Sequence, residues 1–282
     1  MNANALSMNA RGKARRASRS RAMDVGARAG FVARGVIYLL VGVLALRIAF
    51  PDGGGGGKQA DRGGVIAEIA EKPFGSILLL VLGVALAGMA VWRLSEAAFG
   101  QAGPEGDKPG KRAMAAARSV FYAFVSFSVL SYALGDKGSG SGSSDRQTDD
   151  VTARVLQWTG GQWIVGIAGA VVVGAGLWMA YRALARKYHK HLKMGGMTKK
   201  TRQAVDVVGV LGGTVRGAVF VTAGGFAVAA AVRHEPGRAK GMDDTLRSFT
   251  ETPAGPWLLV LVAVGLAAFG LFSWANARWR KV

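Results

Sequence analysis

The side chains best suited to chemistry are three arginines, each followed four residues later by an aromatic residue. The pairs are Arg34 with Tyr38, Arg118 with Tyr122, and Arg216 with Phe220. Residues four apart lie on one face of a helix, so the two side chains of each pair can meet. Because guanidinium groups bind phosphate and carboxylate through paired hydrogen bonds, these positions are candidate sites for an anionic lipid or solute.

Each arginine begins an apolar segment that is nearly long enough to cross a membrane. Crossing about 30 Å of hydrocarbon takes roughly 20 helical residues, so the turn that holds the arginine must also enter the membrane region. A second long apolar segment follows each one after a polar connection. The sequence therefore predicts an all-α membrane protein with six transmembrane helices, arranged as three repeated hairpins. The predicted helices are 31–50, 74–94, 114–134, 161–184, 211–232 and 255–275.

The hairpins read as internal repeats. Gly75, Gly161 and Gly255 begin the second segments, and an aromatic residue follows at the same distance in each copy. Such self-similarity is typical of repeated structural units. Because each copy has two spans, all copies share one orientation, which allows either a pseudo-threefold axis or three hairpins in a row.

This pattern divides the chain into four parts. They are a disordered basic tail at 1–24 and hairpin repeats at 25–104, 105–190 and 191–282. Within the repeats, short amphipathic helices on the membrane surface are predicted in the connections. They fall at 63–72, 151–158 and 243–252.

One acidic residue stands near a repeated arginine. Glu96, at the end of its apolar segment, is the predicted counter-charge of Arg34. The aligned residues in the other copies are Arg182 and Asn276, so this pairing is not repeated. The alternative interpretation gives the arginines no ligand: they extend toward the headgroups, as arginine commonly does at the ends of membrane helices, and the aromatic residues only pack.

The charge distribution predicts orientation and partners. The 282 residues carry a formal net charge of +19, and half of them are hydrophobic. Basic residues far outnumber acidic ones on the side of both termini but not in the opposite loops, so both termini are predicted to be cytoplasmic in a bacterial plasma membrane. The basic residues lie between apolar segments, so anionic lipid headgroups are the expected partners and no specific nucleic acid is expected.

Other kinds of site find little support. The chain has no cysteine, which excludes disulfides, thiol chemistry and iron–sulfur ligation by cysteine. His189, His191 and His234 have no second ligand at helical spacing, so no metal site is predicted. The sequence shows no acid–base pair and no arrangement of residues typical of nucleophilic catalysis. We therefore predict no catalytic residue and no cofactor, and an enzyme is the least supported class.

The chain resembles a bacterial membrane family known as a domain of unknown function (number 1206). The resemblance rests on the run from Ala33 to Gly42 and on Pro73-Phe74-Gly75, with Trp92-Arg93-Leu94 after it. Copy 2 lacks the proline and the glycine after its arginine, and copy 3 has Phe220 in place of tyrosine. The resemblance implies an architecture and no activity.

These observations favour a non-enzymatic membrane protein with a structural or accessory role. Its basic cytoplasmic face is expected to bind anionic lipid, a protein partner or a second copy of the chain. The alternative is a small channel or transporter with an arginine-lined cytoplasmic vestibule. The middle thirds of all six segments are uncharged, which argues against coupled transport more than against a passive pore.

Overall fold

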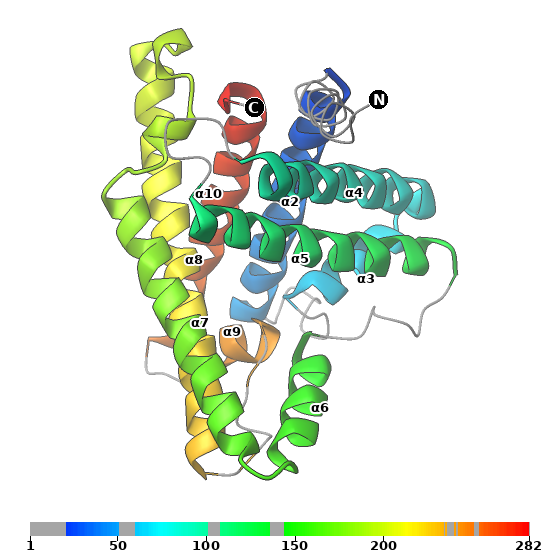
Figure 1. Cartoon of the computed structure of the whole chain (residues 1–282), viewed down its shortest axis with the longest axis vertical. Helices are drawn as coiled ribbons and strands as arrows, with labels where there is room; N and C mark the ends of the chain where they lie inside the picture. The colour runs from blue at the N-terminus through cyan, green and yellow to red at the C-terminus, as the bar shows by residue number, and fades with distance from the viewer. Residues whose placement is uncertain are drawn as a thin grey trace, which may run out of the picture.

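The computed structural model describes residues 21–50, 60–100, 108–135, 144–233, 235, 240, 242–250 and 254–281. Within these ranges, six helices are long and apolar enough to cross a membrane, which confirms the predicted architecture. They are α2 (Arg21–Ala49), α4 (Gly75–Phe99), α5 (Pro109–Ala133), α7 (Gly161–Leu184), α8 (Lys199–Arg233) and α10 (Gly255–Trp279) (Figure 1).

The first helix of each copy begins earlier than its apolar segment. α2 begins at Arg21, so the last four residues of the tail predicted as disordered are helical, and residues 1–20 lie outside the described part. α8 has 35 residues, about 52 Å at 1.5 Å per residue. The apolar segment marks the part of a helix that can cross a membrane, whereas the backbone hydrogen-bond ladder continues through the polar turns before it.

Three short helices occupy the connections between long ones. They are α3 (Arg62–Ala70), α6 (Ser144–Leu156) and α9 (Met242–Thr250). The Asp61 carboxylate caps α3 by accepting a hydrogen bond from the backbone N–H of Gly64. Asp243 of α9 accepts a hydrogen bond of 2.6 Å from the backbone N–H of Ala60, which joins the connection of copy 3 to that of copy 1. α3 and α9 form where the sequence predicts them, whereas α6 begins at Ser144, before its predicted start at residue 151. Their place on a membrane surface stays a prediction.

The long helices pack in the order α5, α4, α2, α10, α8 and α7. Copy 1 therefore lies next to copy 3, as a cyclic arrangement requires. The arms of copy 1 (α2 and α4) and of copy 3 (α8 and α10) pack against each other, but α5 and α7 of copy 2 make little or no contact. Figure 1 shows α5 beside α4 and α7 beside α8. The contacts thus form a ring that is open within copy 2.

One close contact recurs at all three interfaces between copies. It joins the residue after each repeated arginine to a small residue on the second arm of another copy. The pairs are Gly35 with Gly270, Gly217 with Gly176, and Ser119 with Ala90. A Cβ on Gly35 or Gly217 would lie 2.9 or 2.6 Å from the partner's carbonyl oxygen. In copy 2 the Ser119 hydroxyl donates a hydrogen bond of 2.8 Å to that carbonyl. Small residues let the backbones approach, as is common between membrane helices.

The interior away from the chain termini is filled with apolar side chains. Those exposed by no more than 3 % include Val41, Leu44, Leu79, Val129, Leu259 and Leu266. They belong to four different helices and to one continuous cluster. Buried charged residues lie toward the two ends instead. Asp61, Glu68 and Asp243 lie in the connections, whereas Arg93 and Glu96 lie at the end where both termini are found, called the terminal end below (Figure 1).

Candidate functional site

The three repeated arginines converge inside the terminal end instead of pointing away from one another. Arg118 of α5 is close enough to Arg216 of α8 for their charges to interact. The hydroxyl of Tyr122 interacts electrostatically with both Arg34 and Arg216. All three arginine side chains are partly buried. The fold therefore brings these residues together, with Tyr122 among them.

Two further arginines join them. Arg93 of α4 is 3 % exposed, and Arg280 follows directly after α10. Arg280 interacts electrostatically with Arg34, Arg93 and Arg118. We call the five residues Arg34, Arg93, Arg118, Arg216 and Arg280 the arginine cluster. The sequence analysis did not select Arg93 or Arg280 as site residues. Arg93 stands in the family-like Trp92-Arg93-Leu94 run, and Arg280 has no distinguishing sequence signal.

Arg34 is held by groups from two other copies. Its Nε donates a hydrogen bond of 3.0 Å to the Ser273 hydroxyl of α10, and its Nη1 donates one of 3.4 Å to the Tyr122 hydroxyl of α5. The guanidinium also lies over the rings of Phe31 and Phe269, at 4.8 and 5.3 Å from their centroids. The aromatic partner of Arg34 is thus Tyr122, and not the residue four positions further along its own helix.

Arg216 lies among aromatic rings. Its guanidinium carbon is 4.7 Å from the ring centre of Phe269, 5.2 Å from that of Phe220 and 5.4 Å from that of Tyr38. Its Nε is buried and has no hydrogen-bond partner in the described part of the chain. Rings attract a cation but accept no strong hydrogen bond, so the donor capacity of Arg216 is left for another group.

Glu96 pairs with Arg93 and not with Arg34. The Nη1 of Arg93 donates a hydrogen bond of 2.5 Å to a carboxylate oxygen of Glu96, three residues later on α4. The Arg93 guanidinium also stacks over Trp92 at 4.2 Å. The expected Arg34–Glu96 pair is therefore not formed, because Arg93 is nearer on the same helix face. The Nε atoms of Arg93 and Arg280 are buried and lack partners among the described residues.

The arginine cluster carries an excess of positive charge. Glu96 is the one carboxylate that forms a hydrogen bond or ion pair with a cluster arginine in the described ranges. Five guanidinium groups and one carboxylate leave a formal excess of four positive charges. Buried charges without partners are strongly unfavourable in a medium of low dielectric constant. The described residues therefore leave most of the positive charge of the cluster without a counter-charge.

The positive charge of the arginine cluster also affects the neighbouring loop, which contains His191. Burial, together with the charges of Arg280 and Arg182, lowers the pKa of His191 to about 4. Burial and the charge of Arg93 lower the pKa of Arg280 to about 9. His191 lies in a segment that is fastened to the C-terminal residues, since Lys193 N–H donates to the Trp279 carbonyl and Lys281 N–H donates to the His191 carbonyl. An isolated antiparallel bridge between Leu192 and Arg280 results.

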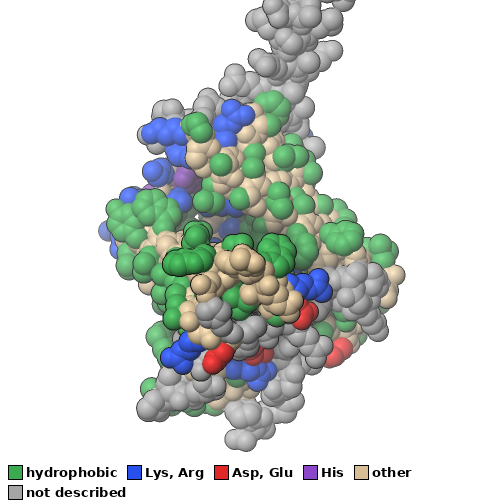
Figure 2. All heavy atoms as spheres, turned by 60° about the horizontal axis from the view of Figure 1, so that its bottom comes forward, with side chains coloured by type: hydrophobic (Ala, Val, Ile, Leu, Met, Phe, Trp, Pro, Cys, Tyr) green, Lys and Arg blue, Asp and Glu red, His purple; other side chains and the backbone are tan. Residues whose placement is uncertain are grey.

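The surface is hollowed where basic groups lie inside. Figure 2 shows a hollow near the centre of the view, with Lys and Arg side chains deeper than the hydrophobic side chains at its border. Such a combination of apolar rim and basic floor suits an amphiphile more than a small ion.

His189 belongs to a separate group of polar contacts. The ring of His189 lies 2.5 Å from a carboxylate oxygen of Asp206, which also accepts a hydrogen bond of 3.1 Å from the Tyr188 hydroxyl. This carboxylate raises the pKa of Tyr188, after burial as the larger cause. Among the described residues no group of three metal-ligating side chains occurs, and His234 lies outside them.

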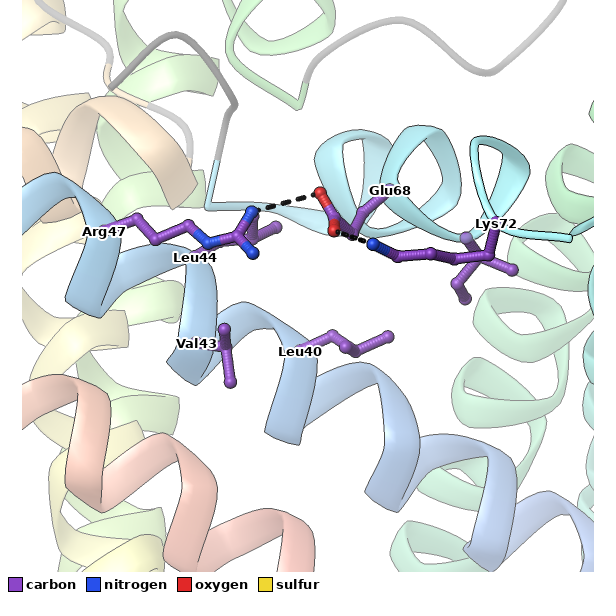
Figure 3. Close-up of a pocket in the computed structure, with 7 residues that line it drawn as sticks. Leu40, Val43, Leu44, Arg47, Glu68 and Lys72 are labelled. Atoms are coloured by element: carbon purple, nitrogen blue, oxygen red, sulfur yellow. Dashed lines mark hydrogen bonds and ion pairs between the residues drawn. The ribbon is translucent and has the colours of Figure 1, made fainter. Parts of the chain in front are cut away.

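A second charged group lies at the end opposite the termini. The Glu68 carboxylate of α3 pairs with Arg47 of α2 at 3.3 Å and with Lys72 at 3.1 Å (Figure 3). Leu40, Val43 and Leu44 line the small pocket beneath, of about 150 Å³. Here the Glu68 carboxylate lies between the two cations and balances part of their charge. This ion-paired group therefore serves to hold α3 against α2.

Fold and site together define a multi-pass membrane protein with a partly buried cluster of arginines at its terminal end. The model of one family, Domain of Unknown Function (DUF1206), matches the chain three times, at residues 29–100, 113–186 and 211–280. The chain belongs to this family. Each match includes the apolar parts of the two long helices of one copy.

A relative from Bacillus subtilis (strain 168) shows similarity over most of its length. This uncharacterized protein, YxxB, is 26% identical over 261 residues, which cover 90% of this chain and 92% of the relative. No solved structure is significantly similar to the chain.

Proposed function

We propose that this protein is a non-enzymatic membrane protein that binds the anionic headgroup of a lipid in its arginine cluster. In this proposal the terminal end faces the cytoplasm of a bacterial plasma membrane. The observation that carries the proposal is the convergence of five guanidinium groups with one carboxylate, while three of their Nε atoms lack partners in the described ranges. Guanidinium groups bind phosphate oxygens through two parallel hydrogen bonds, which the ring contacts leave available.

The chemistry of the cluster favours binding over catalysis. A guanidinium group stays protonated at neutral pH, so it donates hydrogen bonds without accepting or releasing a proton. The other groups described near the cluster are aromatic rings, the hydroxyls of Ser273 and Tyr122, the imidazole of His191 in the neighbouring loop and a carboxylate already paired with Arg93. In this proposal the guanidinium and hydroxyl groups hold the anion in place, and no proton transfer is assigned to any of them.

The packing favours a headgroup site over a pore. The interior beyond the cluster is filled by the buried apolar side chains of four helices, which supports a site closed at one end. Interfacial depth near the helix ends is also where a lipid phosphate lies. The alternative is a channel or transporter with the arginine cluster as its vestibule, and the convergence of the arginines is the observation that favours it.

Exchange of cluster arginines tests the proposal. We expect wild-type protein purified from membranes to retain anionic phospholipid, measured by mass spectrometry of extracted lipid. Arg34→Gln and Arg216→Gln should each reduce retention at least about fivefold, near 1 kcal/mol. Arg34→Lys should lose nearly as much, since an ammonium cannot reproduce the planar pair of donors. The control is Arg202→Gln, which removes an exposed charge at the same end.

Two outcomes would count against a headgroup site. Equal lipid retention in all four variants would overturn it and leave the arginines as interfacial anchors. Passage of chloride or phosphate through vesicles containing the wild-type protein, reduced by Arg34→Gln but not by Arg202→Gln, would instead establish the channel alternative.

A further inference from the structure

The opening between α5 and α7 has a cause in the sequence of copy 2. Four residues before the repeated arginine, copies 1 and 3 have Gly30 and Gly212. Each lies so close to the second arm of its own copy that an added Cβ would be 2.3 Å from Met89 or Phe269. Copy 2 has Met114 at this position, and Met114 is 53% exposed. The bulkier side chain thus stands where the other hairpins close.

Copy 2 nevertheless keeps the glycines with which copy 1 closes. In copy 1, Gly26 of α2 and Gly88 of α4 meet, and a Cβ on Gly88 would lie 3.0 Å from Gly26 Cα. The aligned residues of copy 2 are Gly110 and Gly174. Nothing lies within 4 Å of a Cβ built on either of them. The two helices therefore carry a matching contact that this structure leaves unmade.

Two arginines flank the opening. Arg118 of α5 and Arg182 of α7 are close enough for their like charges to repel. Neither side chain forms a hydrogen bond or ion pair with a residue that the structure describes. Arg182 occupies the position of Glu96 in copy 1 and Asn276 in copy 3, so copy 2 alone places a cation there. An anionic group between the two arginines would replace repulsion by two attractive contacts.

Beyond these arginines, both helices expose apolar side chains. Phe127 of α5 is exposed, as are Ile167 and Val171 of α7. These side chains suit acyl chains, while the arginines at the terminal end of the same two helices suit a phosphate. The opening thus combines both halves of a phospholipid's chemistry.

We propose that α5 and α7 form a lateral portal through which an anionic phospholipid enters the arginine cluster from the bilayer, with Arg118 and Arg182 as headgroup-binding residues. This inference rests on the proposed function and adds the route and Arg182. The acyl chains leave between α5 and α7, and the headgroup bridges the two helices that otherwise have little contact.

A reversible cross-link tests the portal. Since the chain has no native cysteine, Gly110→Cys combined with Gly174→Cys places two thiols where copy 1 makes its closing contact. We expect oxidation of the delipidated double variant to reduce uptake of phosphatidylglycerol from mixed micelles at least fivefold. Reduction should restore uptake, and each single variant should bind like wild type. Uptake by the cross-linked protein at the wild-type level would overturn the portal.

Photolabelling gives a second readout that does not depend on disulfide formation. Phosphatidylglycerol with a photoreactive acyl chain should label peptides of α5 and α7, and Arg182→Gln should reduce that labelling while Arg202→Gln should not. Labelling confined to other helices, or displacement of the lipid by excess inorganic phosphate, would overturn the inference. If Arg34→Gln loses lipid while the cross-link has no effect, the proposed function stands and only the portal fails.

Discussion

Arg34 and Tyr122 are 88 residues apart in the chain, yet the Arg34 Nη1 lies 3.4 Å from the Tyr122 hydroxyl. Arg216 of copy 3 lies over Tyr38 of copy 1 in a corresponding relationship. Each of these arginines contacts the aromatic residue of the following copy, with copy 1 following copy 3. The arginine cluster is therefore a product of the contacts between copies, and no single hairpin contains it.

The hydroxyls of Tyr122 and Tyr38 should therefore contribute differently to stability. Tyr122→Phe removes an acceptor of Arg34 and should lower the free energy of unfolding by about 0.5–1 kcal/mol, the usual worth of one hydrogen bond. Tyr38→Phe is the matched control and should have little effect, since Arg216 contacts its ring. Thermal unfolding in detergent measures both, and an equal loss in the two variants would contradict the assigned partners.

Removal of the Glu96 charge should have opposite effects on stability and on binding. Glu96→Gln leaves the buried Arg93 without its counter-ion and should destabilise the lipid-free protein by about 2–4 kcal/mol. The same change increases the positive excess of the arginine cluster, so the affinity for anionic lipid should rise. Unfolding with and without added phosphatidylglycerol measures both effects. A variant that is destabilised equally in both conditions would argue against an anion near Arg93.

The glycine contacts between copies predict a contrast between near neighbours on α7. A Cβ on Gly176 would lie 2.6 Å from the Gly217 carbonyl oxygen, so Gly176→Ala should cost about 1–3 kcal/mol through forced separation of α7 and α8. Gly174→Ala meets nothing within 4 Å and should be neutral or stabilising by up to about 1 kcal/mol, because alanine is the better helix former. Similar melting temperatures for the two variants would contradict the α7–α8 interface.

His191 predicts a loss of stability in acid. Its pKa is about 4 in the folded protein against 6.5 for an unperturbed side chain, so the folded state binds fewer protons between these values. The contribution is therefore complete above pH 6.5 and is lost as the pH falls toward 4. Because the side chain is partly exposed, screening limits the loss to about 1 kcal/mol. His191→Gln should show a smaller fall in melting temperature from pH 7 to pH 4.5, and an unchanged fall would contradict the assignment.

The orientation can be measured at two matched glutamines. Gln157 and Gln203 are exposed and lie at opposite ends of the molecule, near the starts of α7 and α8. With cytoplasmic termini, an impermeant thiol reagent applied to intact cells should label Gln157→Cys and not Gln203→Cys. The reverse pattern would place both termini outside.

Local sequence patterns predict most of the architecture. Hydropathy finds all six long helices, and the polar starts of α2, α5 and α8 are missed because a helix can continue beyond the apolar part that crosses a membrane. The connections form helices because their apolar residues recur at helical spacing. The positions of these helices depend on residues that are close together in the chain, so the sequence alone is enough to predict them.

The candidate site depends on contacts that no local pattern contains. Spacing of four residues predicts that Arg34 meets Tyr38, but packing between copies offers Tyr122 instead. Arg280 joins the cluster only because α10 packs against α2. The opening in copy 2 has a sequence signal, Met114 in place of glycine, that becomes meaningful only once the contact of Gly30 is known.

Because α2 packs against α10, the fold cannot be completed until α10 has been synthesised. α2 is the first long helix of the described chain to leave the ribosome. α10, against which it packs extensively, is the last. Roughly 200 residues separate them, so synthesis at about 5–20 residues per second leaves α2 without that partner for about 10–40 s. During this interval Arg34 has no Ser273 to accept its hydrogen bond. Arg280, which follows α10 directly, joins the arginine cluster only after α10 has been synthesised.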